Sequence, residues 1–250
     1  MLLLPPALAE RLHSASRVVA FTGAGISAES GLGTFRGADG LWEKFRPEDL
    51  ATPEAFERQP ARVWRWYAER HRTMAAARPN PGHVALASWQ DLFPSFTLVT
   101  QNIDHLHQRA GARDVLELHG SLFRARCVSC AASIPFADAL ERPGEPPRCA
   151  CGGALRPDVV WFGELLPDDA LAAATRAARR AEIFVAVGTS ATVYPAAGLI
   201  ELAYDQGAAV IEVNPEPTPL SWLAALKLRD PASLVLPTLT DALRACRTPS

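Results

Sequence analysis

The sequence has almost no lysine: of its 25 basic residues only Lys44 and Lys227 are lysine, and the others are arginine. The net charge is also small, −2 at pH 7. A domain that holds nucleic acid or an anionic membrane surface usually carries a strong cationic excess. The composition therefore argues against both partners. We draw no function from the preference for arginine, which GC-rich coding accounts for.

Long apolar runs are missing as well. Residues 1–6 have no basic n-region, and their apolar run is too short for a signal peptide. No stretch approaches the ~20 apolar residues of a membrane span. We therefore expect a cytoplasmic protein without a membrane partner. The length of 250 residues, 48% of them hydrophobic, suits one sizeable core or one large and one small domain.

Cysteine is scarce too, but four of the five cysteines are closely paired. Cys127 and Cys130 form a C-x-x-C pair, and Cys149 and Cys151 form a C-x-C pair after 18 intervening residues. In the cytosol such pairs are more typical of metal sites than of disulfides. Four thiolates leave no open position on tetrahedral Zn²⁺, so we expect structural zinc. The tighter C-x-C spacing leaves the geometry of that half less defined, and Cys246 has no partner in sequence.

A glycine turn after the first apolar segment organises the chain. Residues 17–21 predict a buried strand, and Gly23, Gly25 and Ala28 follow it with the spacing G-x-G-x-x-A. This spacing fits the fingerprint of dinucleotide-binding folds, in which the backbone approaches a pyrophosphate at a helix N-terminus. A helix that starts near Ser27 would complete the fingerprint. On its own, the pattern fits a tight strand-to-helix turn without a ligand equally well.

Apolar strands recur along the rest of the chain and alternate with helical segments. Continuous apolar strands separated by helices indicate a parallel sheet covered on both faces. The predicted fold class is therefore α/β, with a Rossmann-like parallel sheet. We expect further strands at residues 96–100, 115–118, 183–187, 208–213 and 233–236, and helices at 6–15, 106–110, 168–181 and the C-terminus.

The second strand of an ordinary dinucleotide-binding fold, with an acidic residue at its end, is absent from its place ~30 residues on. This absence makes a simple dehydrogenase the least favoured interpretation. Residues 36–92 indicate aromatic helices instead, with Pro53 and Pro60 suited to first turns. We expect this helical insertion and a zinc module at 121–157 to form a small domain. The Rossmann-like domain would comprise 1–35, 93–120 and 158–250.

Small and polar residues follow the expected strands at five places. The carboxyl ends of parallel strands lie along one edge of a sheet, where ligands bind in such folds, so the five ends predict a common site. A histidine there, with a reference pKa near ~6.5, is a candidate general base. The strand-end residues are Gly23, Ala24, Gly25, Gln101, Asn102, Ile103, Asp104, His119, Gly120, Gly188, Thr189, Ser190 and Asn214.

Taken in order, these motifs resemble those of sirtuins, the NAD-dependent protein-lysine deacylases, over residues 10–240. The resemblance implies a Rossmann-like sheet with an inserted helical and zinc domain, which accounts for the missing second strand. Gly33 departs from the proline that is common in the family, and His105 from a glycine. The motifs are residues 23–27, 34–36, 100–104, 119–120, 188–190 and Asn214, together with the two cysteine pairs.

The resemblance implies NAD as cofactor and His119 as general base toward a ribose hydroxyl, with nicotinamide and O-acyl-ADP-ribose as products. An acyl-lysine peptide of a protein substrate would add as a strand along an extended edge formed by Val160, Trp161, Phe162 and Gly163. The implied cofactor-binding residues are Gly23, Ala24, Gly25, Ser27, Glu29, Thr34, Phe35, Arg36, Trp42, Gln101, Asn102, Ile103, Asp104, Gly188, Thr189, Ser190, Asn214, Pro215, Glu216 and Ala232.

Two side chains bear on which acyl group is removed. Tyr67 and Arg70 stand at i and i+3, on one helix face, where a core tyrosine beside a surface arginine is the plain interpretation. They also match the Tyr-x-x-Arg motif of class III sirtuins, which remove succinyl, malonyl and glutaryl groups, and Ala51 resembles the small residue lining that pocket. A guanidinium binds a carboxylate bidentately, and a phenol adds one hydrogen bond. We therefore predict desuccinylation and demalonylation together with deacetylation.

Two alternative functions would use the same cofactor site. One is mono-ADP-ribosyl transfer, and the other is non-enzymatic sensing of NAD or ADP-ribose. The presence of His119, Tyr67 and Arg70 favours the deacylase over the transferase, and His119 with Asn102 disfavours the sensor. The physiological substrates, the balance between acyl groups and the oligomeric state stay open, with a monomer as the simplest expectation.

Overall fold

The central sheet of the computed structural model is parallel throughout. The structure describes residues 4–34 and 46–247. The strand order is β3-β2-β1-β7-β8-β9, and all five pairings are parallel, which confirms the expected α/β sheet. The strands are β1 (Arg17–Thr22), β2 (Ser95–Thr100), β3 (Leu116–Glu117), β7 (Ile183–Val187), β8 (Ala209–Val213) and β9 (Ala224–Leu228).

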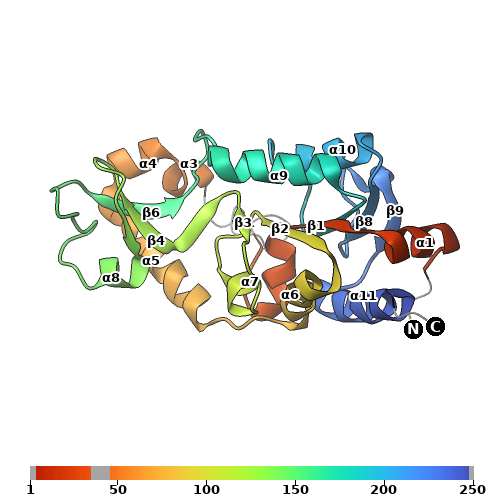
Figure 1. Cartoon of the computed structure of the whole chain (residues 1–250). Coiled ribbons are helices and arrows are strands. Elements are labelled where there is room, and N and C mark those ends of the chain that lie inside the picture. The colour runs from red at the N-terminus through yellow and green to blue at the C-terminus, as the bar shows by residue number, and fades with distance from the viewer. Residues whose placement is uncertain (1–3, 35–45, 248–250) are drawn as a thin grey trace.

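Helices cover both faces of this sheet, as the continuous apolar strands predict (Figure 1). Val18 and Ala20 of β1 belong to a core closed by α1 (Pro6–Ser14), α6 (Pro81–Leu92) and α11 (Ala232–Arg247). Val19 and Phe21 point to the other face, into a core closed by α9 (Asp168–Arg180) and α10 (Gly198–Asp205). Because successive strand residues alternate between faces, a single apolar strand serves both cores.

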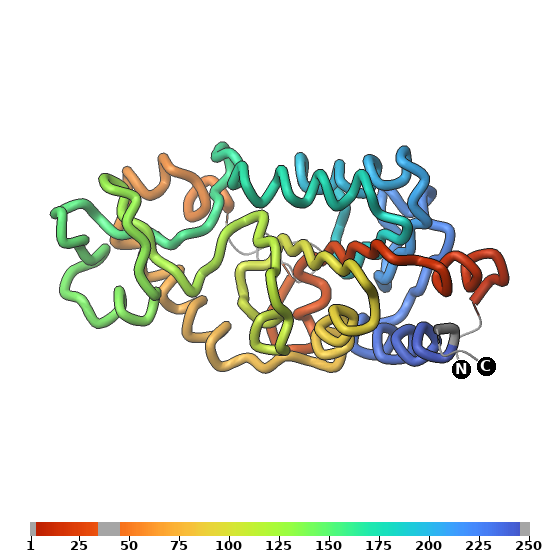
Figure 2. The backbone as a smooth tube through the Cα atoms, in the orientation of Figure 1, coloured from red at the N-terminus to blue at the C-terminus, as the bar shows by residue number. Residues whose placement is uncertain are grey.

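A second, smaller domain has its own apolar core. Figure 2 shows two segments that are distant in sequence, 46–76 and 120–159, meeting at one end of the molecule. The first supplies α3 (Pro47–Leu50), α4 (Pro53–Arg58) and α5 (Pro60–Ala76). The second supplies α8 (Phe136–Leu140) and an antiparallel sheet ordered β5-β4-β6, made of β5 (Ser133–Pro135), β4 (Gly120–Cys127) and β6 (Leu155–Val159). The expected pairing of helical insertion and cysteine module is thus observed.

Helix α6 packs with the large sheet, although the sequence groups it with the insertion. Leu86 and Trp89 lie in the core beneath the sheet, and the Trp89 indole nitrogen donates to the Thr240 hydroxyl of α11 at 2.8 Å. The aromatic helical sequence does not by itself show which helix packs in the small domain and which packs against the large sheet. We therefore propose that the insertion ends before Pro81, and not at residue 92 as the sequence suggests.

The last expected strand is wrong. Residues 233–236 lie in α11, and the last strand is β9, which the sequence analysis missed. The Pro231 carbonyl accepts hydrogen bonds from the main-chain N–H groups of Leu234 and Val235, which starts a helix. Val235, Leu236 and Leu239 are buried at helical spacing. A short apolar run cannot distinguish a strand from a buried helix by periodicity alone.

No helix within residues 4–34 and 46–247 is long and apolar enough to cross a membrane.

Candidate active site

The glycine turn after β1 lies directly against the turn after β7. Gly23 donates its main-chain N–H to the Val187 carbonyl at 3.0 Å, and Gly25 donates to the Gly188 carbonyl at 2.8 Å. A Cβ on Gly25 would come within 2.7 Å of the Gly188 Cα, and Gly188 itself has a φ of +57°. These glycines therefore allow two backbones to touch, in addition to any ligand they admit.

The helix after this turn differs from the expected one. A 3₁₀ helix, η1, spans Ala24–Ser30 and ends at Gly31, which has a φ of +83°. It begins three residues before the predicted start near Ser27. The Ile26 N–H donates to the Gly23 carbonyl at 3.2 Å, which tightens the turn to i→i+3 bonding. Ser27 consequently points into the protein and is 2% exposed.

A buried polar network links the ends of β1 and β2. The Asn102 amide donates to the Gly23 carbonyl at 3.1 Å and to the Ser27 hydroxyl at 3.2 Å. Ser27 donates to the Asp104 carboxylate at 2.7 Å, and the Leu106 N–H donates to its other oxygen at 2.9 Å. Burial raises the pKa of Asp104, although these two hydrogen bonds oppose the shift. Four expected cofactor residues, Gly23, Ser27, Asn102 and Asp104, are thus held together.

Two buried histidines behind this network were not predicted from the sequence. His83 lies 3.3 Å from Ser27 Oγ through Nε2, and His107 lies 2.9 Å from Thr22 Oγ1 through Nε2. Burial lowers the pKa of His83 to about 4 and that of His107 to about 3. Both are therefore neutral at pH 7. Nothing in their local sequence signals this role, because segments from three parts of the chain meet there.

His119, the candidate general base, has a defined tautomer. Its Nδ1 lies 3.0 Å from the Gln101 main-chain oxygen, and a carbonyl can only accept, so Nδ1 carries the proton. Nε2 is then the basic nitrogen. Burial lowers the pKa of His119, and the hydrogen bond to Gln101 partly opposes this effect. The imidazole is therefore neutral and able to accept a proton near pH 7.

The ends of β7 and β8 form the other half of the site. The Gln101 amide donates to Thr189 Oγ1 at 2.9 Å, and the Asn214 amide donates to the Thr189 carbonyl at 3.1 Å. Ser190 is exposed and shares a 2.8 Å hydrogen bond with Thr192. The predicted strand ends of β1, β2, β7 and β8 therefore meet at one edge of the sheet, as parallel pairing requires.

The remaining expected cofactor residues lie around this half or outside the described chain. Glu29 accepts a 3.2 Å hydrogen bond from the Ser233 N–H, beside the buried Ala232 at the start of α11. Pro215 and Glu216 are exposed after β8. Thr34 is half-buried. Phe35, Arg36 and Trp42 lie outside the residues that the structure describes.

A buried acidic residue on β8 was also missed. Glu212 is 5% exposed and accepts hydrogen bonds from the hydroxyl groups of Thr218 and Ser221 at 2.7 Å. It also forms a 2.6 Å ion pair with Arg229. The Glu212 carboxylate therefore stabilises the loop that follows β8. Its place in an apolar strand gave no sequence signal.

The expected acyl-binding segment after β6 contacts His119 at one residue and the small domain at the next two. The Val160 N–H donates to the His119 carbonyl at 3.0 Å, and the Phe162 N–H donates to the Ala51 carbonyl at 2.9 Å. The Trp161 indole donates to the Tyr67 hydroxyl at 3.0 Å. Ile103, a candidate nicotinamide neighbour, shares one apolar core with Ala51, Tyr67 and Trp161.

The segment after β6 differs from the expected extended edge, and Arg70 is less exposed than a surface arginine. Strand β6 ends at Val159, and Phe162 and Gly163 form a turn, with a φ of +87° at Gly163, instead of continuing an extended edge. Arg70 is half-buried, with its guanidinium carbon 4.9 Å from the centre of the Trp66 ring. Burial lowers the pKa of Arg70, and the nearby Tyr67 opposes this shift.

The four paired cysteines converge at the far end of the small domain. Their sulfur atoms all lie within 4.8 Å of one another, with 3.5 Å between Cys127 and Cys151 and 3.8 Å between Cys130 and Cys149. Four sulfurs around a tetrahedral zinc at ~2.3 Å would lie roughly 3.8 Å apart. Backbone N–H groups of Cys130 and Ser129 lower the pKa of Cys127, which favours its thiolate. The cluster fits structural zinc, including its C-x-C half.

Known proteins resemble this chain over nearly its whole length. The family model described as "Sir2 family" matches residues 23–195. A protein of Aquifex aeolicus named NAD-dependent protein deacylase is 53% identical over 228 residues, which cover 91% of this chain and 95% of that protein. A Mycobacterium tuberculosis protein of the same name is 52% identical, over 92% and 98%.

Solved structures agree. A Sir2 homologue in complex with NAD superposes with a TM-score of 0.90 at 45% identity, covering 98% of this chain and 96% of that one. A complex of Sir2, a p53 peptide and NAD⁺ gives 0.85 at 32% identity, covering 96% and 98%. With this fold, these strand ends and this sequence identity, the chain belongs to the Sir2 family.

Proposed function

We propose that this NAD-dependent protein deacylase removes succinyl and malonyl groups from lysine, as well as acetyl groups. The observation that carries the acyl preference is the placement of a phenol and a guanidinium one helical turn apart on α5, both shielded from water. Tyr67 is 4% exposed and Arg70 is half-buried. Charge–charge attraction strengthens as water is excluded, so this site would bind a terminal carboxylate well.

The room for a longer acyl group would come from Ala51. It is buried in the same apolar core as Tyr67, and its carbonyl accepts the hydrogen bond from Phe162. A larger residue here would fill space beside the phenol. An acetyl group needs no such space, which is consistent with both activities in one pocket.

The relatives named NAD-dependent protein deacylase, and the Sir2 homologue solved with NAD, support NAD as the cofactor. The polar groups at the strand ends fit it, because they come from neighbouring parallel strands and gather at one edge. The Gly23 turn, Asn102 and Asp104 would hold its nicotinamide half, and Thr189 and Asn214 its adenosine half. When bound, NAD supplies a ribose carbon that takes up the acyl oxygen as nicotinamide leaves.

His119 would act as the general base. Its Nδ1 proton is committed to the Gln101 carbonyl, so Nε2 would accept the proton of a ribose hydroxyl. The hydrogen bond from Val160 to the His119 carbonyl ties this base to the acyl-binding segment. One residue therefore connects the cofactor half of the site with the substrate half.

The substrate peptide would lie along the segment after β6. A relative, Sir2, has been solved with a p53 peptide bound, which supports a peptide as the substrate of this chain. In this chain the main-chain N–H and carbonyl of Trp161 are both bonded to Glu164, at 2.8 and 3.0 Å. The peptide would therefore pair with main-chain groups on either side of Trp161, the carbonyl of Val160 and the groups of Gly163.

A mass-spectrometric assay tests the proposal. Purified protein and NAD are incubated with one peptide carrying acetyl-, succinyl- or malonyl-lysine, with His119→Ala as the matched inactive variant. Succinyl loss accompanied by O-succinyl-ADP-ribose, absent in the variant, is the expected result. Acetyl removal alone would retain the deacylase and remove the acidic-acyl preference. ADP-ribose attached to protein, without deacylation, would favour the transferase.

A further inference from the structure

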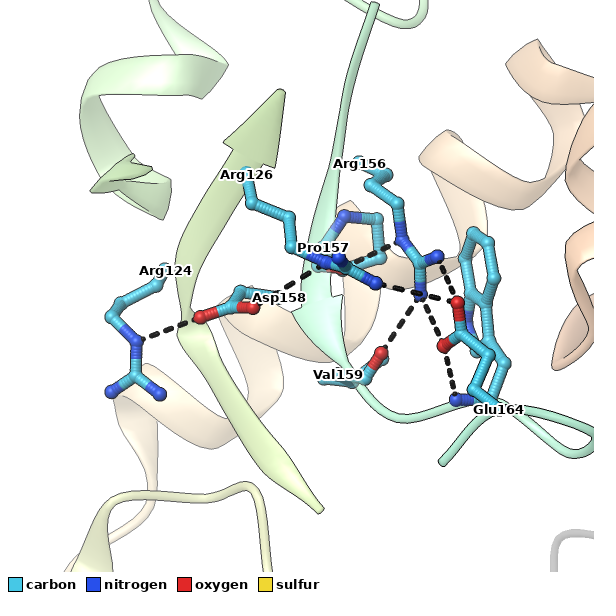
Figure 3. A network of polar contacts seen from close by, with 8 residues as sticks. Arg124, Arg126, Arg156, Pro157, Asp158, Val159 and Glu164 are labelled. Atoms are coloured by element: carbon cyan, nitrogen blue, oxygen red, sulfur yellow. Dashed lines mark hydrogen bonds and ion pairs between the residues drawn. The ribbon is translucent and has the colours of Figure 1, made fainter. Parts of the chain in front are cut away.

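A buried arginine and a half-buried glutamate lie beside the acyl-binding residues and have no part in the chemistry described above. Arg156 is in β6 and its side chain is 7% exposed; Glu164 follows the turn at Gly163. The two side chains meet as a fork, with Nη1 to Oε1 at 2.5 Å and Nη2 to Oε2 at 2.8 Å (Figure 3). Such bidentate pairs fix both side chains in one geometry.

This pair holds Trp161 from two directions. The Arg156 guanidinium carbon lies 3.4 Å from the centre of a Trp161 ring, stacked on its face. Glu164 Oε2 accepts the Trp161 main-chain N–H at 2.8 Å. The Val159 carbonyl accepts a further 2.8 Å hydrogen bond from Arg156 (Figure 3). The position of the indole therefore depends on the Arg156–Glu164 pair.

The indole in turn decides how Tyr67 uses its hydroxyl group. An indole nitrogen can only donate, so the 3.0 Å contact from Trp161 Nε1 makes the Tyr67 oxygen the acceptor. Burial raises the pKa of Tyr67, so the phenol keeps its proton. Within residues 4–34 and 46–247, no hydrogen-bond acceptor for that proton is present. The Tyr67 hydroxyl proton is thus available to donate a hydrogen bond to a ligand.

We propose that Arg156 and Glu164 are positioning residues for acyl selectivity: through Trp161 they orient the Tyr67 hydroxyl as a donor toward the carboxylate of an acidic acyl group. This inference rests on the proposed succinyl and malonyl specificity. An acetyl group has no terminal carboxylate to receive the proton, so the arrangement favours acidic acyl groups. The pair acts through another residue and does not touch the acyl chain.

Arg126 provides a matched control, because it also contacts Glu164 but does not stack on the indole. Its Nη2 lies 3.3 Å from Glu164 Oε1, and its side chain is 38% exposed. It also forms an ion pair with Asp158, at 3.6 Å from Nε to Oδ1 (Figure 3). Arg126→Ala therefore removes a charge beside Glu164 and leaves the Arg156 fork in place.

The decisive experiment measures kcat and KM for succinyl- and acetyl-lysine forms of one peptide. In Arg156→Lys the charge stays but the fork and the flat stacking are lost. The ratio of kcat/KM for succinyl over acetyl should fall about five- to tenfold, the equivalent of one hydrogen bond, through a higher KM for the succinyl peptide. Arg126→Ala should leave this ratio unchanged.

A double-mutant cycle separates positioning from a general loss of structure. If Arg156 acts through the Tyr67 hydroxyl, Arg156→Lys should change the ratio much less in a Tyr67→Phe background than in the native protein. Trp161→Phe, which replaces the indole with a smaller aromatic ring and removes the N–H donor, should also lower the ratio. It serves if Arg156→Lys folds poorly. An effect of Arg156→Lys that persists undiminished without the Tyr67 hydroxyl would overturn the inference.

The same measurements distinguish failure of the inference from failure of the proposed function. A native protein that removes acetyl but no succinyl group would overturn both. A native protein that removes succinyl groups, together with an unchanged ratio in Arg156→Lys and in Trp161→Phe, would overturn the positioning role alone.

Discussion

His119 Nδ1 lies 3.0 Å from the main-chain oxygen of Gln101, and this contact fixes which imidazole nitrogen is basic. The carbonyl belongs to the residue that follows β2, whereas His119 follows β3. Two neighbouring strand ends therefore set the tautomer of the candidate base.

Activity should stay high as the pH falls through 6.5. Burial disfavours the imidazolium and lowers the pKa of His119, so the basic form persists below the ordinary value of 6.5. We expect the acid limb of kcat/KM against pH, measured with the acetyl peptide, to have its midpoint below 6.5. A midpoint above 7 would show that another group controls this limb.

Arg70→Met should separate the acyl groups. Methionine keeps much of the side-chain length but cannot bind a carboxylate, and a hydrogen bond to a charged group contributes about 1.5 to 3 kcal/mol. We expect kcat/KM for the succinyl peptide to fall about 10- to 100-fold. Deacetylation should change far less. Equal loss of both activities would remove Arg70 from acyl recognition.

Gly188→Ala should destabilise the protein by about 2 to 4 kcal/mol, from the left-handed backbone and the overpacking together. Its φ is +57°, and a Cβ would lie 2.4 Å from the Ile26 main-chain nitrogen. Urea unfolding measures the change. Gly33→Ala is the control, because no atom of the described residues lies within 4 Å of a Cβ there and a tolerated alanine restricts the unfolded chain. Similar losses in both variants would contradict the packing argument.

Two buried histidines should make stability depend on acid pH. The folded-state pKa values, about 4 for His83 and about 3 for His107, lie below 6.5, so only the unfolded state gains these protons as the pH falls. Each then costs about 1.4 kcal/mol per pH unit below pH 6.5, until the folded value is reached. His107→Gln should reduce the slope of unfolding free energy between pH 6 and 4 by that amount. An unchanged slope would refute the neutral assignment.

Removing the proposed zinc should destabilise the small domain. Cys130→Ser leaves three thiolate ligands, and we expect elemental analysis to show less than the one equivalent of zinc bound by the native protein. With zinc about 100-fold above its dissociation constant, its loss costs about 3 kcal/mol. The Cys246→Ser variant, which changes a cysteine outside the four-cysteine cluster, should bind as much zinc as the native protein. A native protein without zinc would contradict the assignment.

Patterns that depend on neighbouring residues predicted most of the sheet. The apolar segments at β1, β2, β7 and β8 identify themselves because strands buried on both faces need continuous apolar residues. β9 was missed because it is an edge strand, and its pattern is only partly buried. Residues 233–236 were misassigned because a run of four apolar residues suits a strand as well as a helix.

The sequence by itself determined the strand-end residues, the cysteine pairs and the Tyr67–Arg70 spacing, because each follows from local periodicity or from a short motif. Only the tertiary structure decided that Gly25 meets Gly188, that His83 and His107 lie behind Ser27, and that Trp161 donates a hydrogen bond to Tyr67. These contacts join segments up to 163 residues apart, as between Gly25 and Gly188, and no local pattern specifies such partners. They form only when parallel pairing and the insertion of the small domain bring the segments together.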